Sequence, residues 1–256
     1  MNHIEGARVL ITGASSGIGA ACARRFAAAG AELFLWARRA DRLEGLAQSL
    51  RSEHGGTVHV AAVDVRDRAA VFKAGHALSD AGSAPHVLLN NAGLASGLDP
   101  FQSSDPEDWD RMIDTNVKGL LNVTRAVLPA MIAQGRGHVI NIGSTAGHMA
   151  YPRGNVYSAT KYAVRALTEG MNIDVAGTPI RVSSVDPGFV ETEFSTVRFH
   201  GDEQRAAKVY EGFRPLSADD VADTVCYVAG LPPHVNIIDV VLVPTAQRNV
   251  YVVDRA

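Results

Sequence analysis

The chain has few of the residues that mark specialised protein classes. Its 256 residues include 2 cysteines, and aromatic residues make up 6% of the total. Cys22 and Cys226 can build no disulfide framework and no C-x-x-C pair, which favours a reducing compartment. The low aromatic content argues against a surface on which nucleic-acid bases stack.

The chain also lacks a large excess of positive or negative charge, and it lacks long apolar runs. Lysine and arginine number 24 against 27 acidic residues, a net charge of −3, so the chain has no basic footprint for nucleic acid. No apolar run approaches the roughly 18 residues that a membrane span needs. The first residues lack the basic and apolar regions of a signal peptide. We therefore expect a cytoplasmic protein with no nucleic-acid partner and no membrane partner.

Short apolar runs alternate along the chain with segments of helical spacing. The runs are mostly apolar throughout, as in parallel strands covered on both faces. Strands are predicted at 7–11, 33–36, 58–63, 87–89, 138–142, 180–185 and 240–243, and helices at 17–29, 69–81, 108–134 and 157–175. This alternation predicts an α/β fold, a single doubly wound Rossmann-type domain with a parallel sheet of about seven strands.

No linker or internal repeat divides the chain, so residues 1–256 are predicted to form one domain. A long polar stretch near 190–215 follows a predicted strand. It predicts a mobile substrate loop with helical pieces, with an ordinary surface insertion as the alternative.

A glycine-rich turn follows the first predicted strand. Residues 12–19 read T-G-A-S-S-G-I-G, and such glycines let the backbone approach a pyrophosphate at the N-terminus of a helix. The alternatives are a plain strand-to-helix turn and a nucleophile elbow with Ser15 as nucleophile. The elbow needs an earlier strand for its oxyanion hole. We predict a dinucleotide site formed by Gly13, Ser15, Ser16, Gly17, Ile18 and Gly19.

The end of the second predicted strand indicates which dinucleotide binds. Ala37 stands where an NAD-binding chain would carry an acidic residue, and Arg38 and Arg39 follow it. A guanidinium can pair with a 2′-phosphate through charge-assisted hydrogen bonds. This pattern predicts NADP(H) as the cofactor, against the alternative of a solvated cationic loop.

A second polar cluster is suited to proton transfer. Ser144 follows the predicted strand 138–142, and Tyr157 and Lys161 lie four residues apart on one helix face. An ammonium group beside a phenol stabilises the phenolate and lowers the pKa of the phenol. A serine that orients the reacting oxygen completes the set needed for reversible hydride transfer to a carbonyl. A surface Tyr–Lys contact is the alternative.

With these motifs the chain resembles the short-chain dehydrogenase/reductase family over nearly its whole length. The resemblance implies that Tyr157 is the catalytic acid–base and that Ser144 orients the substrate. It also implies that Lys161 binds the nicotinamide ribose and that Asn116 fixes a water in a proton relay. Further cofactor contacts are implied for Asp64, Val65, Asn91, Ala92, Gly93, Tyr157, Lys161, Pro187, Gly188, Val190 and Thr192.

Several stretches, including 193–199 and 231–237, are similar to NADP-dependent 3-hydroxy acid dehydrogenases. That group acts on L-serine, L-allo-threonine and 3-hydroxypropionate, and on malonic semialdehyde in reverse. A carboxylate substrate needs a cation, for which Arg198 and Arg153 are the candidates. Either could instead be a surface arginine, and Arg153 stands where a small residue is expected.

The resemblance implies a homotetramer, to which the apolar stretches 240–243 and 250–253 could contribute. Two other functions stay open: a reductase of neutral ketones or aldehydes, and a non-catalytic module that senses NADPH. No metal site is predicted, since the histidines show no recognisable ligand spacing. A nucleophilic Ser144–His148 pair lacks an orienting acid by motif.

Overall fold

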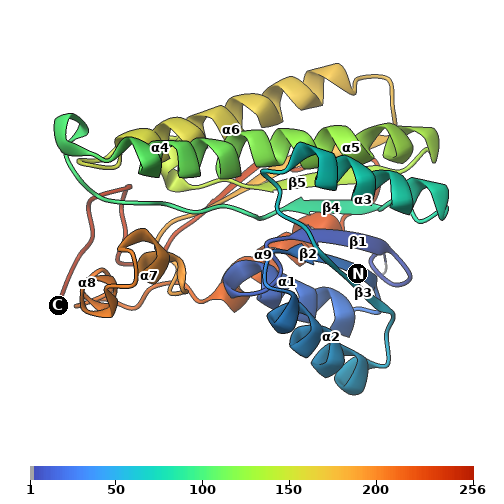
Figure 1. The fold of residues 1–256 in the computed structure, drawn as a ribbon, viewed down its shortest axis with the longest axis horizontal. Helices are drawn as coiled ribbons and strands as arrows, with labels where there is room; N and C mark the ends of the chain where they lie inside the picture. Colours follow the sequence, from blue (N-terminus) through green and yellow to red (C-terminus); the bar gives the residue numbers. More distant parts are fainter. Residues whose placement is uncertain (1–2) are drawn as a thin grey trace.

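The fold is built on one parallel sheet (Figure 1). The computed structural model describes residues 3–256. The sheet has seven strands in the order β3-β2-β1-β4-β5-β6-β7, and every pairing between neighbours is parallel. The strands are β1 (Arg8–Thr12), β2 (Glu32–Ala37), β3 (Val58–Ala62), β4 (Val87–Asn90), β5 (Gly137–Ile142), β6 (Ile180–Pro187) and β7 (Asp239–Leu242). The predicted fold class, a doubly wound Rossmann-type α/β domain with about seven strands, is confirmed.

Helices cover both faces of the sheet. One face carries α1 (Gly17–Ala28), α2 (Ala40–His54) and α9 (Ala218–Ala229), and the other carries α3 (Arg68–Asp80), α5 (Leu120–Ala133) and α6 (Asn155–Asp174). Each face buries its own apolar core, which explains why most strands are apolar along their whole length.

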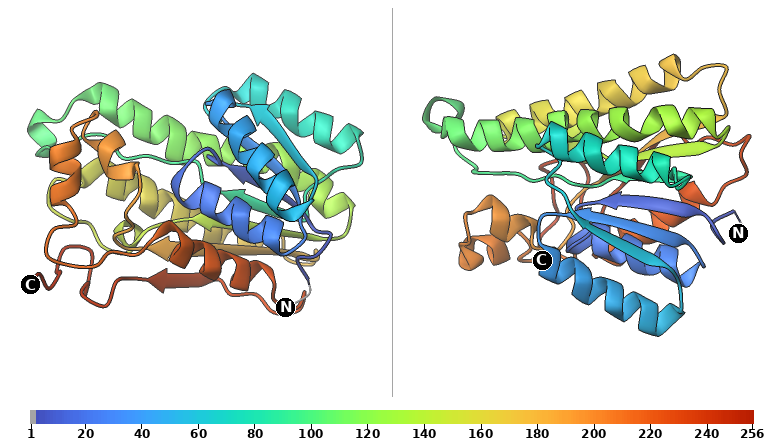
Figure 2. Two further views of the ribbon diagram at one scale, coloured as in Figure 1. Left: turned by 90° about the horizontal axis from the view of Figure 1, so that it is seen from below. Right: turned by 45° about the vertical axis from the view of Figure 1, so that its right-hand side comes forward.

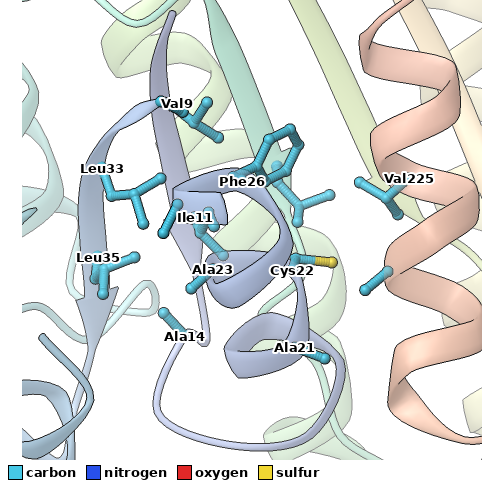
Figure 3. Close-up of a cluster of buried hydrophobic side chains, with 14 of the residues drawn as sticks. Val9, Ile11, Ala14, Ala21, Cys22, Ala23, Phe26, Leu33, Leu35 and Val225 are labelled. Carbon is cyan, nitrogen blue, oxygen red and sulfur yellow. The ribbon is translucent and has the colours of Figure 1, made fainter. Parts of the chain in front are cut away.

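The packing of α1 shows how closely the first core is filled (Figure 3). Phe26 and Cys22 are fully buried between β1 and α9, where they face Val225. The alanines of α1 keep this helix near the sheet and near α9. Cys22 and Cys226 are free thiols, and burial raises the pKa of both, that of Cys226 to about 12.

The predicted helix 108–134 is wrong as a single α-helix. It consists of α4 (Pro106–Ile113), a π-helical segment (Asp114–Gly119) and α5. Apolar residues keep a helical spacing through all three segments. This spacing therefore does not reveal the change from α-helical to π-helical hydrogen bonding. Asp105 caps α4 with a hydrogen bond to the Glu107 N–H, and Pro106 takes the first helical position.

Short elements gather at the end of the molecule to which the strands point (Figure 2). They include the 3₁₀ turns Phe101–Ser103 and Thr145–Gly147, and the helices α7 (Phe194–Arg198) and α8 (Glu203–Lys208). The last two are the helical pieces predicted near 190–215. No helix within residues 3–256 combines the length and the apolar character that crossing a membrane requires.

Candidate active site

The glycine-rich turn lies between β1 and α1, at the point where the strand order reverses. Gly13 and Gly17 have φ angles of +64° and +52°, which favour glycine. A Cβ on Gly13 would stand 2.9 Å from the Ala92 Cα, and one on Gly19 would stand 2.5 Å from the Gly13 carbonyl oxygen. Side chains at these positions would meet neighbouring backbone, so glycines are needed here, and the residues present fit a dinucleotide.

Asn91 braces this turn. Its side-chain Nδ2 donates to the carbonyl oxygens of Thr12 at 2.9 Å and of Gly13 at 3.2 Å. The backbone N–H groups of Asn91 and Ala92 both donate to the Thr12 Oγ1 at 3.0 Å. Thr12, the last residue of β1, was not predicted to have this bracing role. Asn91 connects the ends of β1 and β4 and so shapes the cleft that it was predicted to line.

Arg39 reaches the glycine-rich turn, a contact that was not predicted from the sequence. The Arg39 guanidinium donates to the Ser16 Oγ at 2.7 Å and to the Ser15 Oγ at 3.2 Å. It also pairs with the Glu193 carboxylate, as does Arg42 at 2.6 Å. Hydrogen bonds from Arg42 and Arg39 lower the pKa of Glu193. An anion is therefore already held here within the chain. Arg42 and Glu193 were not singled out from the sequence.

Other predicted cofactor residues surround the same cleft. Asp64 is held by Arg66, whose hydrogen bonds lower the pKa of the Asp64 carboxyl. Val65 is buried beneath Gly119.

Thr192 lies against Gly17, so the segment after β6 reaches the turn. Arg38 is exposed at the end of β2, Gly93 is exposed after β4, and Pro187, Gly188 and Val190 continue from β6.

Ser144 and Tyr157 are both buried. Ser144 begins a 3₁₀ turn after β5, and its Oγ accepts from the Ala146 N–H at 3.1 Å. Tyr157 lies on the first turn of α6, with the Phe194 ring edge-on to it at 5.6 Å. Burial raises the pKa of the Tyr157 phenol, while Ser144 and the Arg198 guanidinium act in the opposite direction.

Lys161 lies one helical turn beyond Tyr157. Its Nζ is 5.9 Å from the centroid of the tyrosine ring and donates to the Ile142 carbonyl oxygen at 2.8 Å. Burial lowers the pKa of Lys161 to about 8. Burial thus disfavours both a phenolate at Tyr157 and an ammonium at Lys161.

Asn116 lies in the π-helical segment and is buried. Its Oδ1 accepts from the Leu94 N–H at 2.8 Å, and its Nδ2 donates to the Leu94 carbonyl and to the Thr160 Oγ1. The amide side chain is therefore fixed between the segment after β4 and α6. π-Helical turns of this kind are frequent at functional sites.

A small pocket opens beside Tyr157, and both candidate arginines line it. The Arg198 guanidinium lies 5.6 Å from the Tyr157 ring centroid, and it donates to the Tyr151 hydroxyl at 2.5 Å and to the Gly97 carbonyl at 3.1 Å. Arg153 is exposed at the pocket mouth with a φ angle of +65°. A left-handed backbone of this kind favours glycine over a residue with a side chain. Tyr151 was not predicted.

His148 has a buried acid partner that the sequence did not reveal. Its Nε2 lies 2.5 Å from the Asp186 Oδ2 and 3.6 Å from the Asp239 Oδ2. These three residues come from different elements, so no spacing rule could find them. Their ligand atoms all lie within 4.8 Å of one another, close enough for a metal ion, but the shortest separation is that of a hydrogen bond.

Comparison with known proteins supports the family resemblance that the sequence predicted. The short chain dehydrogenase family model matches residues 7–203. The NADP-dependent 3-hydroxy acid dehydrogenase YdfG of Salmonella typhi is 48% identical over 240 residues, which cover 93% of this chain and 95% of that one. Sulfoacetaldehyde reductase 2 of Chromohalobacter salexigens is 47% identical over 249 residues, covering 96% and 98%.

Solved structures agree with these relatives. The closed form of serine dehydrogenase complexed with NADP⁺ superposes with a TM-score of 0.89 at 44% identity, covering 94% of this chain and 96% of that one. The predicted resemblance, the oxidoreductase class and the cofactor NADP(H) are confirmed. The chain belongs to the short-chain dehydrogenase family.

Proposed function

We propose that the protein interconverts a 3-hydroxy acid and its carbonyl compound with NADP(H), and that Tyr157 carries the proton. The observation that carries this proposal is the Arg198 guanidinium beside the Tyr157 ring, at 5.6 Å from its centroid. A substrate carboxylate bound by Arg198 would bring the neighbouring hydroxyl to Tyr157 and Ser144.

The roles of the residues follow from their surroundings. When bound, NADP(H) accepts or supplies a hydride at its nicotinamide ring. In the oxidative direction the Tyr157 oxygen takes the hydroxyl proton while Ser144 holds the substrate oxygen, and in reverse Tyr157 returns the proton. Lys161 stabilises the phenolate form. Asn116, fixed to Leu94 and Thr160, keeps the π-helical segment in place for the proton relay.

Cofactor selection belongs to the other side of the cleft. Gly13, Gly17, Ile18 and Gly19 would hold the pyrophosphate, and Arg39 with Ser15, Ser16 and Arg38 would hold the 2′-phosphate. Asp64 and Val65 would contact the adenine. The segment from Pro187 to Thr192 would meet the nicotinamide. The chain would act as one domain, with the loop near 190–215 bringing Arg198 to the substrate.

The decisive assay follows nicotinamide absorbance with L-serine, L-allo-threonine and 3-hydroxypropionate, each with NADP⁺ and with NAD⁺. We expect NADP⁺ reduction that falls by about 10²- to 10⁴-fold in Tyr157→Phe, because general acid–base catalysis is lost. Arg198→Lys keeps a charge but loses the planar fork, and its KM for each acid should rise while Arg136→Lys, at the far end of the sheet, leaves KM unchanged.

Two further substrate classes are separated in the reductive direction. One relative is named a sulfoacetaldehyde reductase, and a guanidinium binds a sulfonate as it binds a carboxylate. Malonic semialdehyde, sulfoacetaldehyde and a neutral aldehyde of similar size should be compared. A preference for the neutral aldehyde would overturn the role of Arg198. NADPH binding without any turnover would instead support a sensing module.

We also propose a cytoplasmic homotetramer. The edge strand β7 and its flanks expose Ile238, Val241 and Val243, an apolar edge that favours association. Light scattering should give four times the mass of the 27.1 kDa chain. Val241→Glu should reduce that mass by weakening the interface.

A further inference from the structure

Asp186 and His148 lie directly behind the catalytic residues. Asp186 stands near the end of β6, is 1% exposed, and accepts a hydrogen bond from Ser184 on one carboxylate oxygen. Its other oxygen lies 2.5 Å from the His148 Nε2. The His148 side chain is 25% exposed, and the backbone carbonyl of His148 accepts from the Tyr162 hydroxyl at 2.8 Å. A buried carboxylate is thus connected to solvent through one imidazole.

Gly143 brings this carboxylate close to the reacting groups. A Cβ on Gly143 would overlap the Asp186 Oδ1, so the absence of a side chain is what admits the carboxylate. Gly143 lies between Ser144 and Ile142, and the Ile142 carbonyl binds the Lys161 Nζ at 2.8 Å. The carboxylate therefore sits beneath the strand end from which both Ser144 and the Lys161 contact project.

We propose that Asp186 and His148 form a positioning pair that sets the protonation of Tyr157 and Lys161. The proposal rests on the proposed roles of those two residues. Asp186 supplies a buried negative charge, and the His148 imidazole, which hydrogen-bonds to it, acts against that charge. Neither residue lines the pocket beside Tyr157.

The charges around the pair support this assignment. The Asp186 carboxylate accepts from the Ser184 hydroxyl and lies beside His148, and the same imidazole has Asp239 as a second carboxylate neighbour. The Asp186 carboxylate opposes the fall in the pKa of Lys161 that burial causes, and it adds to the rise in the pKa of Tyr157. Burial raises the pKa of Asp186 itself, while hydrogen bonds from Ser184 and His148 counter that rise. One negative charge thus raises the proton affinity of both catalytic groups.

The two members of the pair should act in opposite directions. Alcohol oxidation needs the deprotonated Tyr157–Lys161 pair, so kcat/KM rises with pH through the pKa of that pair. Asp186→Asn removes the negative charge and should move this rise to lower pH by about 1 unit. His148→Gln keeps a hydrogen-bond donor but removes the imidazole that acts against the Asp186 charge. The uncompensated carboxylate should then move the rise to higher pH.

The experiment measures kcat/KM for 3-hydroxypropionate oxidation at saturating NADP⁺ across pH 6–10 in the full chain. His59→Gln is the matched control, because His59 also pairs with a carboxylate, Glu32 at 3.0 Å, away from the site. The control should leave the profile where it is. Circular dichroism reports whether each variant folds.

Opposite shifts of the pH profile in Asp186→Asn and His148→Gln support the positioning pair. A purely structural loss would lower kcat/KM in both variants without shifting the two profiles in opposite directions. Displacements in the same direction, or none, overturn it. If Asp186→Asn does not fold, His148→Gln decides alone: a shift to higher pH supports the proposal, and an unmoved profile rejects it. Tyr157→Phe distinguishes a failure of the positioning pair from a failure of the proposed function, because full activity in that variant would refute the proposed function itself.

Discussion

Arg39 is the side chain that we propose selects the cofactor. Its guanidinium already binds Ser15, Ser16 and the Glu193 carboxylate. A 2′-phosphate would take the position of that carboxylate as an anion partner. Hydrogen bonds to charged groups contribute about 1.5–3 kcal/mol. Arg39→Ala should therefore raise the KM for NADP⁺ by about 10- to 100-fold and change the KM for NAD⁺ little.

The measurement for Arg39 is steady-state kinetics with each cofactor. Arg51→Ala is a suitable control, because Arg51 is exposed on α2 and pairs with Glu44. Equal losses with NADP⁺ and NAD⁺ would show that Arg39 supports the turn and does not read the phosphate.

Two substitutions of Arg153 distinguish the cost of its backbone conformation from the contribution of its side chain. Its φ of +65° costs an L-residue about 1–2 kcal/mol relative to glycine. Arg153→Gly should be more stable than Arg153→Ala by about 1 kcal/mol in urea unfolding, because both lose the guanidinium but only glycine accepts this backbone. If the guanidinium binds the substrate, both variants should show the same increase in KM. Equal stability of the two would mean that the turn changes conformation.

Among the secondary-structure elements, two helical glycines differ in the space that surrounds them. Nothing lies within 4 Å of a Cβ built on Gly170 in α6, whereas a Cβ on Gly19 in α1 would stand 2.5 Å from the Gly13 carbonyl oxygen. Gly170→Ala should raise the free energy of unfolding by about 0.5–1 kcal/mol. Gly19→Ala should lower it and also raise the KM for NADP⁺, since the turn must move.

Thermal and urea unfolding of the two alanine variants check this pair of predictions. An unchanged KM for NADP⁺ in Gly19→Ala would show that the close packing of the turn is not needed for binding.

At the scale of the whole molecule, a buried neutral histidine couples stability to pH. His138 is 2% exposed, binds the Ser183 hydroxyl at 2.7 Å, and has its pKa lowered by burial to about 3. In the unfolded chain its pKa is about 6.5. Between pH 6.5 and pH 3 the unfolded state therefore binds a proton that the folded state does not, so stability falls as pH falls.

This group alone contributes a slope of about 1.4 kcal/mol per pH unit in that window. His138→Gln, which retains a donor for Ser183, should have a shallower loss of stability between pH 6.5 and pH 4.5. The check is urea unfolding at a series of pH values. Parallel curves for the two proteins would mean that His138 is already protonated in the native state. Burial also lowers the pKa of His86, to about 4, which acts in the same direction.

Local sequence was sufficient where function depends on short spacing. The glycine-rich turn, the Tyr157–Lys161 pair and the alternation of strands and helices are all set by neighbours within a few residues, and each was predicted. α2 was missed although Leu43, Leu46, Ala47 and Leu50 follow a helical period. This pattern is local, so the helix was predictable from the sequence.

Contacts between residues far apart in the chain arise only in the packed fold. The sequence predicted the doubly wound fold class, the glycine-rich turn and the grouping of Ser144, Tyr157 and Lys161, because parallel strands deliver their carboxyl ends to one edge. It did not determine that Asp186 of β6 holds His148, or that Arg198 reaches Tyr157. Such contacts depend on strand order and on a missing side chain at Gly143, and a buried carboxylate acquires its partners only when the elements pack together.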